Sequence, residues 1–247
     1  MVTRNIKLTI EYDGTNYCGW QKQNSQRTVQ GTIEKAIRDL TKEENLNLIG
    51  CSRTDSGVHA KGFVANFTTN SSIPSNKFRE AINARLPKDI VILLSEQMPS
   101  AFHSRYDSKG KKYVYSILNR AEKCAIGRNY IYSFGRELDL NSINCACKYF
   151  IGTHDFSAFK SQGSSVKTSV RTIFDLDVKK DGDIITVSAS GDGFLYNMVR
   201  IIVGTLLDVG VGKIEPKDVE KIIESKDRLK AGAVVPALGL CLQKVFY

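Results

Sequence analysis

The sequence lacks the residue clusters on which most metal and disulfide sites depend. Its six cysteines form no Cys-x-x-Cys pair, and the closest two, Cys145 and Cys147, lie in an apparent helix without a nearby histidine. Only three histidines are present, and His103 and His154 have no cysteine or carboxylate at ligand spacing. We therefore expect free structural thiols and no bound metal. Free thiols suit the cytoplasm, which is the expected compartment.

Long hydrophobic runs and a secretory leader are also missing. The most apolar stretch, residues 198–211, contains Arg200 and Asp208. It is shorter than the roughly 20 residues that a membrane-spanning helix needs. The first residues run directly into an alternating strand pattern and not into a leader. The sequence thus predicts a buried helix in this stretch and no membrane segment.

Negative charge is in deficit. Twenty-six aspartates and glutamates oppose 35 lysines and arginines, so the formal net charge is +9 and the isoelectric point is near 9.2. Such an excess favours polyanions through attraction and counterion release, so nucleic acid is the expected class of partner. Charge alone leaves a merely solvated basic surface as an equal alternative. A hydrophobic content of 42% with 25% charged residues is that of an ordinary globular protein.

Strand and helix patterns alternate through the first hundred residues. Apolar and polar residues alternate from Ile6 to Tyr12, which is typical of a half-buried strand. Thr28 fits the N-cap of a helix with one apolar face, and Ser75 is the expected cap of a second helix. Residues 90–94 are apolar enough for a central strand. Further strands are expected at 46–51 and 63–67.

A similar order follows after residues 97–108, which fit no pattern and are the expected linker. Strands and helices mix without strict alternation, so α+β is the predicted class. We expect two α+β lobes, residues 1–105 and 106–247, with a cleft between them. The elements expected in the second lobe are strands at 113–118 and 240–246, helices at 143–150, 194–209 and 216–225, and a hairpin of 170–178 with 184–189.

The polar segment from Ser52 to Ala60 lies between two apolar strands. Gly57 allows backbone angles that other residues avoid, and the flanking strand ends hold the segment stiffly. Asp55 stands close to Arg53, and a nearby cation keeps a carboxylate ionised. An ionised carboxylate suits a nucleophile or an electrostatic stabiliser. On composition alone, a tight turn in which Asp55 caps a backbone N–H is the favoured alternative.

A resemblance to a known family changes that balance. Residues 53–60, RTDSGVHA, resemble the R-T-D-x-G-V-H-A motif of the TruA family of tRNA pseudouridine synthases. Each further motif alone would be modest support, but together they run in one order from end to end. They are EYDGTNYCGWQ at 11–21, TVQG at 28–31, KYVY at 112–115, HDFSAF at 154–159, FLYNMVR at 194–200 and PALGL at 236–240.

The resemblance implies the pseudouridine synthase fold, with two ferredoxin-like lobes, mixed and antiparallel sheets, and a catalytic cleft. It implies a homodimeric isomerase that converts uridine to pseudouridine at positions 38–40 of the tRNA anticodon arm. The reaction needs no cofactor, since no redox change occurs and no group is carried.

The resemblance also assigns residues. It makes Asp55 the essential aspartate, Arg200 the active-site cation that pairs with it, and Tyr113 the ring that stacks on the target base. Arg53 and His59 are expected to serve RNA binding, with a loop-stabilising role for His59 as an equal alternative. Leu240 matches an apolar residue near the base. These residues therefore form the predicted site.

Arg200 also has a case from the residues alone. Asn197, Arg200, Gly204 and Asp208 fall at helical spacing on one stripe among apolar neighbours. A helix that is apolar on most sides is buried, so this stripe is expected to face a cleft or a partner. A buried arginine needs an anion, which Asp55, an RNA phosphate or another acid in a structural ion pair could supply.

Three other functions stay open at this point. A related enzyme could perform the same chemistry on other tRNA sites or on ribosomal RNA. A non-catalytic RNA binder could use the same fold, although it would not need Asp55, Tyr113 and Arg200 together. A hydrolase using Asp55 with His59 is weaker, because no metal or oxyanion motif accompanies these residues.

Overall fold

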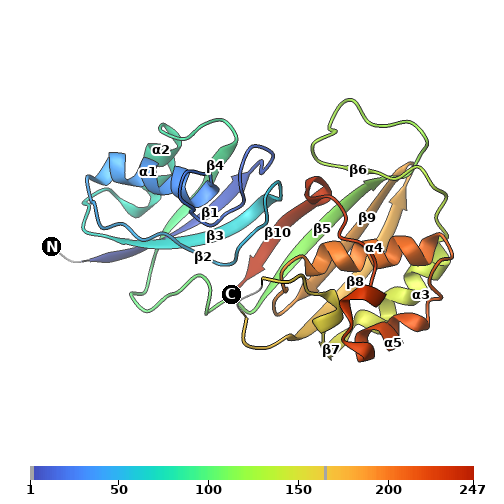
Figure 1. The fold of residues 1–247 in the computed structure, drawn as a ribbon. Helices are drawn as coiled ribbons and strands as arrows, with labels where there is room; N and C mark the ends of the chain where they lie inside the picture. Colours follow the sequence, from blue (N-terminus) through green and yellow to red (C-terminus); the bar gives the residue numbers. More distant parts are fainter. Residues whose placement is uncertain (1–2, 164–165) are drawn as a thin grey trace. The chain divides into compact units, whose positions relative to one another are not determined.

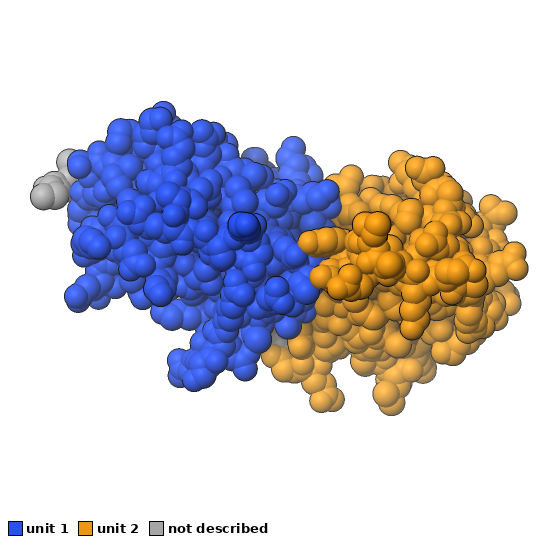
Figure 2. Space-filling model, turned by 90° about the horizontal axis from the view of Figure 1, so that it is seen from above, with its two compact units in different colours: residues 1–109, 241–247 blue, residues 110–240 orange. Residues whose placement is uncertain are grey.

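The computed structural model describes residues 3–163 and 166–247 (Figure 1). The chain divides into two compact units, which Figure 2 distinguishes by colour. Unit 1 comprises residues 1–109 and 241–247, and unit 2 comprises residues 110–240. Each unit combines helices with a largely antiparallel sheet, which confirms the α+β class.

The last residues of the chain return to unit 1. Strand β10 (Leu240–Phe246) pairs in parallel with β3 (His59–Thr69), with Cys241 opposite His59. The backbone N–H of Lys109 also donates to the carbonyl of Phe246 at 2.8 Å. The sequence predicts lobes of 1–105 and 106–247, and the structure differs in this returning strand. Local patterns contain no signal for a pairing between residues nearly 200 positions apart.

Strand β1 is the centre of the unit 1 sheet. It is antiparallel to β3 on one side and to β4 on the other, and the short β2 pairs with β3. Helices α1 and α2 cover one face of this sheet (Figure 1). The bounds are β1 Arg4–Tyr12, β2 Ile49–Gly50, β4 Ile90–Met98, α1 Val29–Thr41, the 3-10 turn η1 Ser75–Lys77 and α2 Phe78–Asn83.

Alternate residues of β1 supply the core of unit 1. Successive strand residues face opposite sides, so the predicted alternation from Ile6 to Tyr12 places its apolar members against the helices. This prediction is confirmed. The fully buried side chains include Ile6, Leu8 and Ile10 of β1, Phe63 and Phe67 of β3, Ile33 and Ile37 of α1, and Phe78 and Ile82 of α2.

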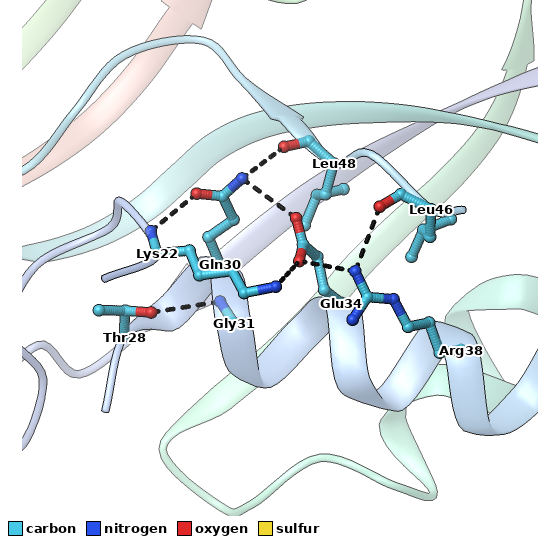
Figure 3. A network of polar contacts seen from close by, with 8 residues as sticks. All are labelled: Lys22, Thr28, Gln30, Gly31, Glu34, Arg38, Leu46 and Leu48. Carbon is cyan, nitrogen blue, oxygen red and sulfur yellow. Dashed lines mark hydrogen bonds and ion pairs between the residues drawn. The ribbon is translucent and has the colours of Figure 1, made fainter. Parts of the chain in front are cut away.

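Helix α1 begins and is anchored through polar contacts (Figure 3). The Thr28 hydroxyl accepts from the Gly31 N–H at 3.3 Å, so the predicted N-cap is confirmed. Glu34 is only 4% exposed, and its burial is tolerated because three side chains donate to its carboxylate. The donors are Lys22 at 3.2 Å, Gln30 at 3.2 Å and Arg38 at 3.3 Å.

Two of these donors also bind the segment that precedes β2. Gln30 Nε2 donates to the carbonyl of Leu48 at 3.0 Å, and Arg38 Nη2 donates to the carbonyl of Leu46 at 3.4 Å (Figure 3). The network thus holds residues 46–48 against α1, just before the chain enters the polar segment that contains Asp55.

The unit 2 sheet has the strand order β5, β9, β8, β7, with each strand antiparallel to its neighbours, and β6 pairs in parallel with β5. The predicted hairpin is confirmed as β8 and β9, whose turn contains Gly182 with a φ of 55°. The bounds are β5 Gly110–Leu118, β6 Tyr132–Ser133, β7 Gly152–Asp155, β8 Val170–Asp181 and β9 Ile184–Gly191.

Three helices cover one face of this sheet, and α4 is buried on most sides, as predicted (Figure 1). Across residues 3–163 and 166–247, no helix is both long and apolar enough to cross a membrane. The bounds are α3 Leu140–Phe150, α4 Met198–Gly210, α5 Asp218–Ser225, and the 3-10 turns η2 Ser157–Phe159, η3 Arg228–Lys230 and η4 Ala237–Gly239.

Some local predictions are wrong. Strand β4 lies at the outer end of the sheet order and not in its centre, and its Leu93 and Leu94 are exposed. Ser75 is the first residue of η1, and no side-chain hydrogen bond caps α2. Helix α4 begins only at Met198, because Asn197 adopts a left-handed backbone with a φ of 61°.

Cys145 and Cys147, both on helix α3, provide a test of which face of the helix is buried. Cys147 is 3% exposed and burial raises the pKa of its thiol to about 12, whereas Cys145 is exposed. The thiolate is the reactive form. We therefore expect iodoacetamide at pH 8 to modify Cys145 and to react with Cys147 slower by a factor on the order of 1,000. Labelling of Cys147 should increase as the pH rises toward 12.

Mass spectrometry of timed samples measures both rates. In Cys145→Ser, α3 should stay unlabelled at pH 8. Equal labelling of the two thiols in the folded protein would show that the buried face of α3 is assigned incorrectly.

Candidate active site

Asp55 lies in the connection between β2 and β3. The chain leaves β2 through Cys51, whose N–H donates to the carbonyl of Val64 on β3 at 2.8 Å. It then turns at Asp55, whose carbonyl accepts from the N–H of Val58 at 3.2 Å. Gly57 has a φ of 77°, a left-handed conformation that favours glycine. The predicted role of Gly57 in shaping this loop is therefore confirmed.

A second loop, residues 13–20, holds the Asp55 loop by backbone contacts. The N–H of Trp20 donates to the carbonyl of Thr54 at 3.1 Å, immediately before Asp55. On the other side, the carbonyl of Tyr17 accepts from the N–H of Gly57 at 3.3 Å and from the Ser56 hydroxyl at 3.1 Å. Asp55 thus stands between residues that are bonded to the same neighbouring loop.

Two glycines make this close approach possible. A Cβ at Gly14 would lie 2.0 Å from the carbonyl oxygen of Val58, and a Cβ at Gly19 would lie 2.5 Å from that of Thr54. Gly19 also has a φ of 81°. Any side chain at either position would push the two loops apart, since backbone atoms cannot yield as the end of a side chain can.

Side chains add two further links between the loops. The hydroxyls of Tyr12 and Thr54 lie 2.8 Å apart in a buried hydrogen bond. Nδ1 of the buried His59 lies 3.1 Å from both the N–H of Gly14 and the carboxylate of Asp13. These two contacts are alternatives, because Nδ1 accepts from Gly14 when it carries no proton and donates to Asp13 when it carries one. His59 therefore stabilises the loop in both states.

The 13–20 loop is itself fixed at Tyr17. The Tyr17 hydroxyl donates to Asp89 Oδ1 at 2.6 Å and accepts from Arg27 Nη2 at 2.9 Å. The Arg27 guanidinium also lies over the Tyr17 ring, 4.5 Å from its centre. Burial first, and the bond to Asp89 second, raise the pKa of Tyr17 far above its usual range, so the hydroxyl keeps its proton. The carbonyl of Tyr17 is thereby presented to Gly57 and Ser56 from a fixed ring.

Arg200 is positioned in unit 2 by two hydrogen bonds. Its Nε donates to the carbonyl of Val235 at 2.8 Å, and its Nη1 donates to Asn197 Oδ1 at 2.7 Å. Asn197 in turn donates to the Ser161 hydroxyl at 2.9 Å. The guanidinium is thus oriented by the turn that precedes α4 and by the segment around residue 235.

The polar stripe of α4 is covered over part of its length. A Cβ at Gly204 would lie 1.9 Å from the carbonyl oxygen of Ala233, and the Thr205 hydroxyl accepts from the N–H of Gly232 at 2.9 Å. The expectation that the whole stripe faces a cleft or partner is therefore wrong at Gly204. The glycine is there because another backbone segment packs directly against the helix.

Tyr113 and Leu240 are both buried residues of unit 2. The Tyr113 ring, on β5, meets Phe194 edge-on, with ring centres 5.3 Å apart. Leu240 follows η4, and its N–H donates to the carbonyl of Ala237. Tyr115 is a core residue, fully buried, and it donates its hydroxyl to the carbonyl of Pro236 at 2.7 Å.

The predicted site residues are divided between the two units. Arg53, Asp55 and His59 belong to one loop and the start of β3 in unit 1, where Arg53 is exposed. Tyr113, Arg200 and Leu240 belong to unit 2. The supports of the Asp55 loop are not among the predicted site residues, although Gly14 and Gly19, within a segment rich in aromatic residues, are a usable signal in the sequence.

The two isolated histidines have structural contacts. His154 Nε2 lies 3.0 Å from the carbonyl of Ile151, and His103 Nδ1 accepts from the N–H groups of Arg105 and Tyr106. Among the described residues, no three histidine, cysteine, aspartate or glutamate side chains are grouped so that they could hold a metal ion. The chemistry available at the Asp55 loop is that of a preorganised carboxylate.

Proteins of one family match this chain along nearly its whole length. The model of the family described as tRNA pseudouridine synthase matches residues 8–107 and 146–247, which include Asp55 and Arg200 but not Tyr113. A protein of Clostridium acetobutylicum named tRNA pseudouridine synthase A is 57% identical over 99% of this chain and 100% of its own length. A Clostridium perfringens protein, tRNA pseudouridine synthase A 2, is 58% identical over the same shares.

Substitution of Gly19 by alanine tests the contact between the two loops. The new methyl group would meet the Thr54 carbonyl and would also have to adopt a left-handed backbone. We expect the free energy of unfolding to fall by about 2–4 kcal/mol, since overpacking and a strained φ both contribute. Amide hydrogen exchange should also accelerate at Trp20 and Gly57, which bond across the two loops.

Cys18→Ala, in the same loop, is the matched control and should leave exchange at these two amides unchanged. Chemical denaturation gives the stability and exchange by mass spectrometry gives the local effect. Wild-type exchange at Trp20 and Gly57 in Gly19→Ala would refute the clamping role of this loop.

Proposed function

The chain belongs to the tRNA pseudouridine synthase family, and from that premise we propose that it converts uridine to pseudouridine at positions 38–40 of the tRNA anticodon arm. The family assignment supplies the class of reaction and tRNA as the class of substrate. The anticodon positions and a homodimeric state rest on the motifs shared with the TruA family, whereas the proposed cytoplasmic location rests on the free thiols. The net charge of +9 supports a polyanionic substrate.

The observation that carries this proposal is the rigid attachment of the Asp55 loop. In the proposed role, the Asp55 carboxylate attacks either C6 of the uracil or C1′ of the ribose. Both routes break the bond between N1 and C1′, turn the base and form a bond between C5 and C1′, and the bond to Asp55 breaks again before release. The hydrogen on C5 leaves as a proton, and N1 takes up a proton, so the product is an isomer of the substrate. No electrons enter or leave, so no redox cofactor is required.

A nucleophile of this kind must be held at a productive angle before the substrate arrives. The contacts from Tyr12, Tyr17 and Trp20 fix the residues on both sides of Asp55. They use hydroxyl and backbone groups of residues that flank Asp55, so the loop is ordered on both sides of the proposed nucleophile.

We assign the remaining site residues as follows. Arg200 stabilises negative charge during catalysis, and its two bonds to Val235 and Asn197 support the role because they orient the guanidinium. Tyr113 stacks on the target base, which must leave the helical stack of the RNA for the reaction to occur. Arg53 and Leu240 contact the substrate, with Arg53 available on the surface for a phosphate.

Loss of hydrogen from C5 gives a direct assay for Asp55. With tRNA that carries tritium at uracil C5, we expect the wild-type protein to release tritium to water. Asp55→Asn preserves the size of the side chain but removes its charge, so release should fall by a factor on the order of 1,000 or more. Asp175→Asn, on the exposed part of β8, is the control and should release tritium at the wild-type rate.

Tritium release that persists in Asp55→Asn would remove Asp55 from catalysis. No release by the wild type from any RNA, with tRNA binding intact, would identify a binding protein with this fold. Wild-type melting behaviour of Asp55→Asn is needed for both conclusions.

Mapping of the product separates the anticodon arm from other targets. We expect carbodiimide labelling of pseudouridine and primer extension to stop at positions 38, 39 or 40 of unmodified tRNA treated with the protein. Transcripts with cytidine at these positions should show no stop. Stops elsewhere in tRNA, or in ribosomal RNA only, would keep the chemistry and refute the proposed target.

A further inference from the structure

Tyr106 is a large aromatic residue that unit 1 leaves in solvent. It is 76% exposed, although it does not extend from the surface alone. Its ring stacks on the imidazole of His103, with ring centres 4.2 Å apart and the planes inclined by 28°. Although His103 stacks on it, most of the Tyr106 side chain remains accessible to solvent.

The loop that carries Tyr106 is firmly attached to the sheet, although the sequence suggests a linker here. Ser104 is fully buried, and its N–H donates to Asn66 Oδ1 at 2.9 Å. The Ser104 hydroxyl donates to the carbonyl of Ile49 at 2.6 Å, and its carbonyl accepts from the Tyr247 hydroxyl at 2.6 Å. Ile49 is in β2, the strand that leads into the Asp55 loop.

His103 is fixed in the orientation that supports Tyr106. Its Nδ1 accepts from the N–H groups of Arg105 and Tyr106, each at 3.2 Å, so this nitrogen carries no proton. The backbone N–H of His103 donates to Asp107 Oδ2 at 2.9 Å, and the backbone carbonyl of His103 accepts from the N–H of Asp107 at 3.0 Å. The stacked pair is therefore held in place before any partner binds.

The charges around Tyr106 indicate the class of partner. Arg105 is exposed, and its guanidinium carbon lies 6.0 Å from the centre of the Tyr106 ring. Lys109 is exposed a few residues further on, whereas one oxygen of Asp107 is engaged by His103. A largely exposed aromatic ring with a guanidinium close to it suits an unpaired nucleotide, whose base stacks while its phosphate meets the cation.

We propose that His103, Arg105 and Tyr106 form a stacking platform for an unpaired base of the RNA substrate other than the target uridine. The inference rests on the proposed function for the identity of that RNA. The platform positions tRNA relative to the Asp55 loop, because Ser104 ties it to the strand that precedes this loop. Tyr106 is thus a binding residue and takes no part in the chemistry.

Two variants of Tyr106 separate stacking from other roles. Tyr106→Ala should raise the Kd and the KM for tRNA roughly 5- to 100-fold, as expected for loss of one base–aromatic stack, with little change in kcat. Tyr106→Phe retains the ring, so both constants should stay within about twofold of wild type. Phe174→Ala, which removes a half-exposed aromatic side chain of unit 2, is the control and should change neither constant.

The salt dependence of tRNA binding tests whether Arg105 contacts a phosphate. Arg105→Gln should weaken binding and should also reduce the slope of log Kd against log salt concentration by about one phosphate contact. Tyr106→Ala should weaken binding with the slope unchanged, because stacking releases no counterions. Filter binding across a salt series gives the Kd values, and tritium release at varied tRNA concentration gives KM and kcat.

Tyr106→Ala with wild-type Kd and KM would overturn the platform, and so would a Tyr106→Phe variant as weak as Tyr106→Ala. These outcomes differ from failure of the proposed function. Wild-type protein that binds tRNA through Tyr106 but releases no tritium would overturn the proposed reaction and leave the platform standing. Wild-type tritium release combined with an unchanged KM in Tyr106→Ala would overturn the platform alone.

Discussion

The close backbone packing of residues 14–20 against residues 54–58 is the constraint on which the rest of unit 1 depends. Gly14 and Gly19 allow carbonyl groups of the Asp55 loop to approach closer than any Cβ would permit. Hydrogen bonds then join the loops on both sides of Asp55. A loop that would otherwise lose much conformational entropy on substrate binding is thereby ordered in advance.

Side-chain packing in the core of unit 1 connects these two loops to the sheet. Trp20, whose N–H bonds to Thr54, also stacks on Phe63 of β3 with ring centres 3.9 Å apart. Gly50 of β2 lies directly beneath the indole, where a Cβ would be 2.5 Å from Nε1. Arg27 and Asp89 hold the other end of the loop through Tyr17. The position of Asp55 is therefore set by packing between elements far apart in the sequence.

Sequence patterns predicted the elements that local spacing and turn residues determine. They missed the arrangements that depend on contacts between distant segments of the chain. The alternation of β1, the Thr28 cap and the hairpin of β8 and β9 follow from spacing and turn residues, and all are confirmed. The outer position of β4 and the pairing of β10 with β3 depend on contacts across the chain. Residues 97–108 lack periodicity because they are held by buried polar bonds, such as those of Ser104, and not by a repeating apolar face.

The candidate site follows the same division. The residues proposed for the site at 55, 113 and 200 could be picked out from short motifs, because each belongs to a segment that resembles the family. The supports could not, because they consist mainly of backbone groups, which carry no sequence signature. Only their glycines are visible in the sequence. These backbone contacts, from Trp20 to Thr54 and from Gly57 to Tyr17, order the loop before any substrate binds, which is what a positioned catalytic group needs.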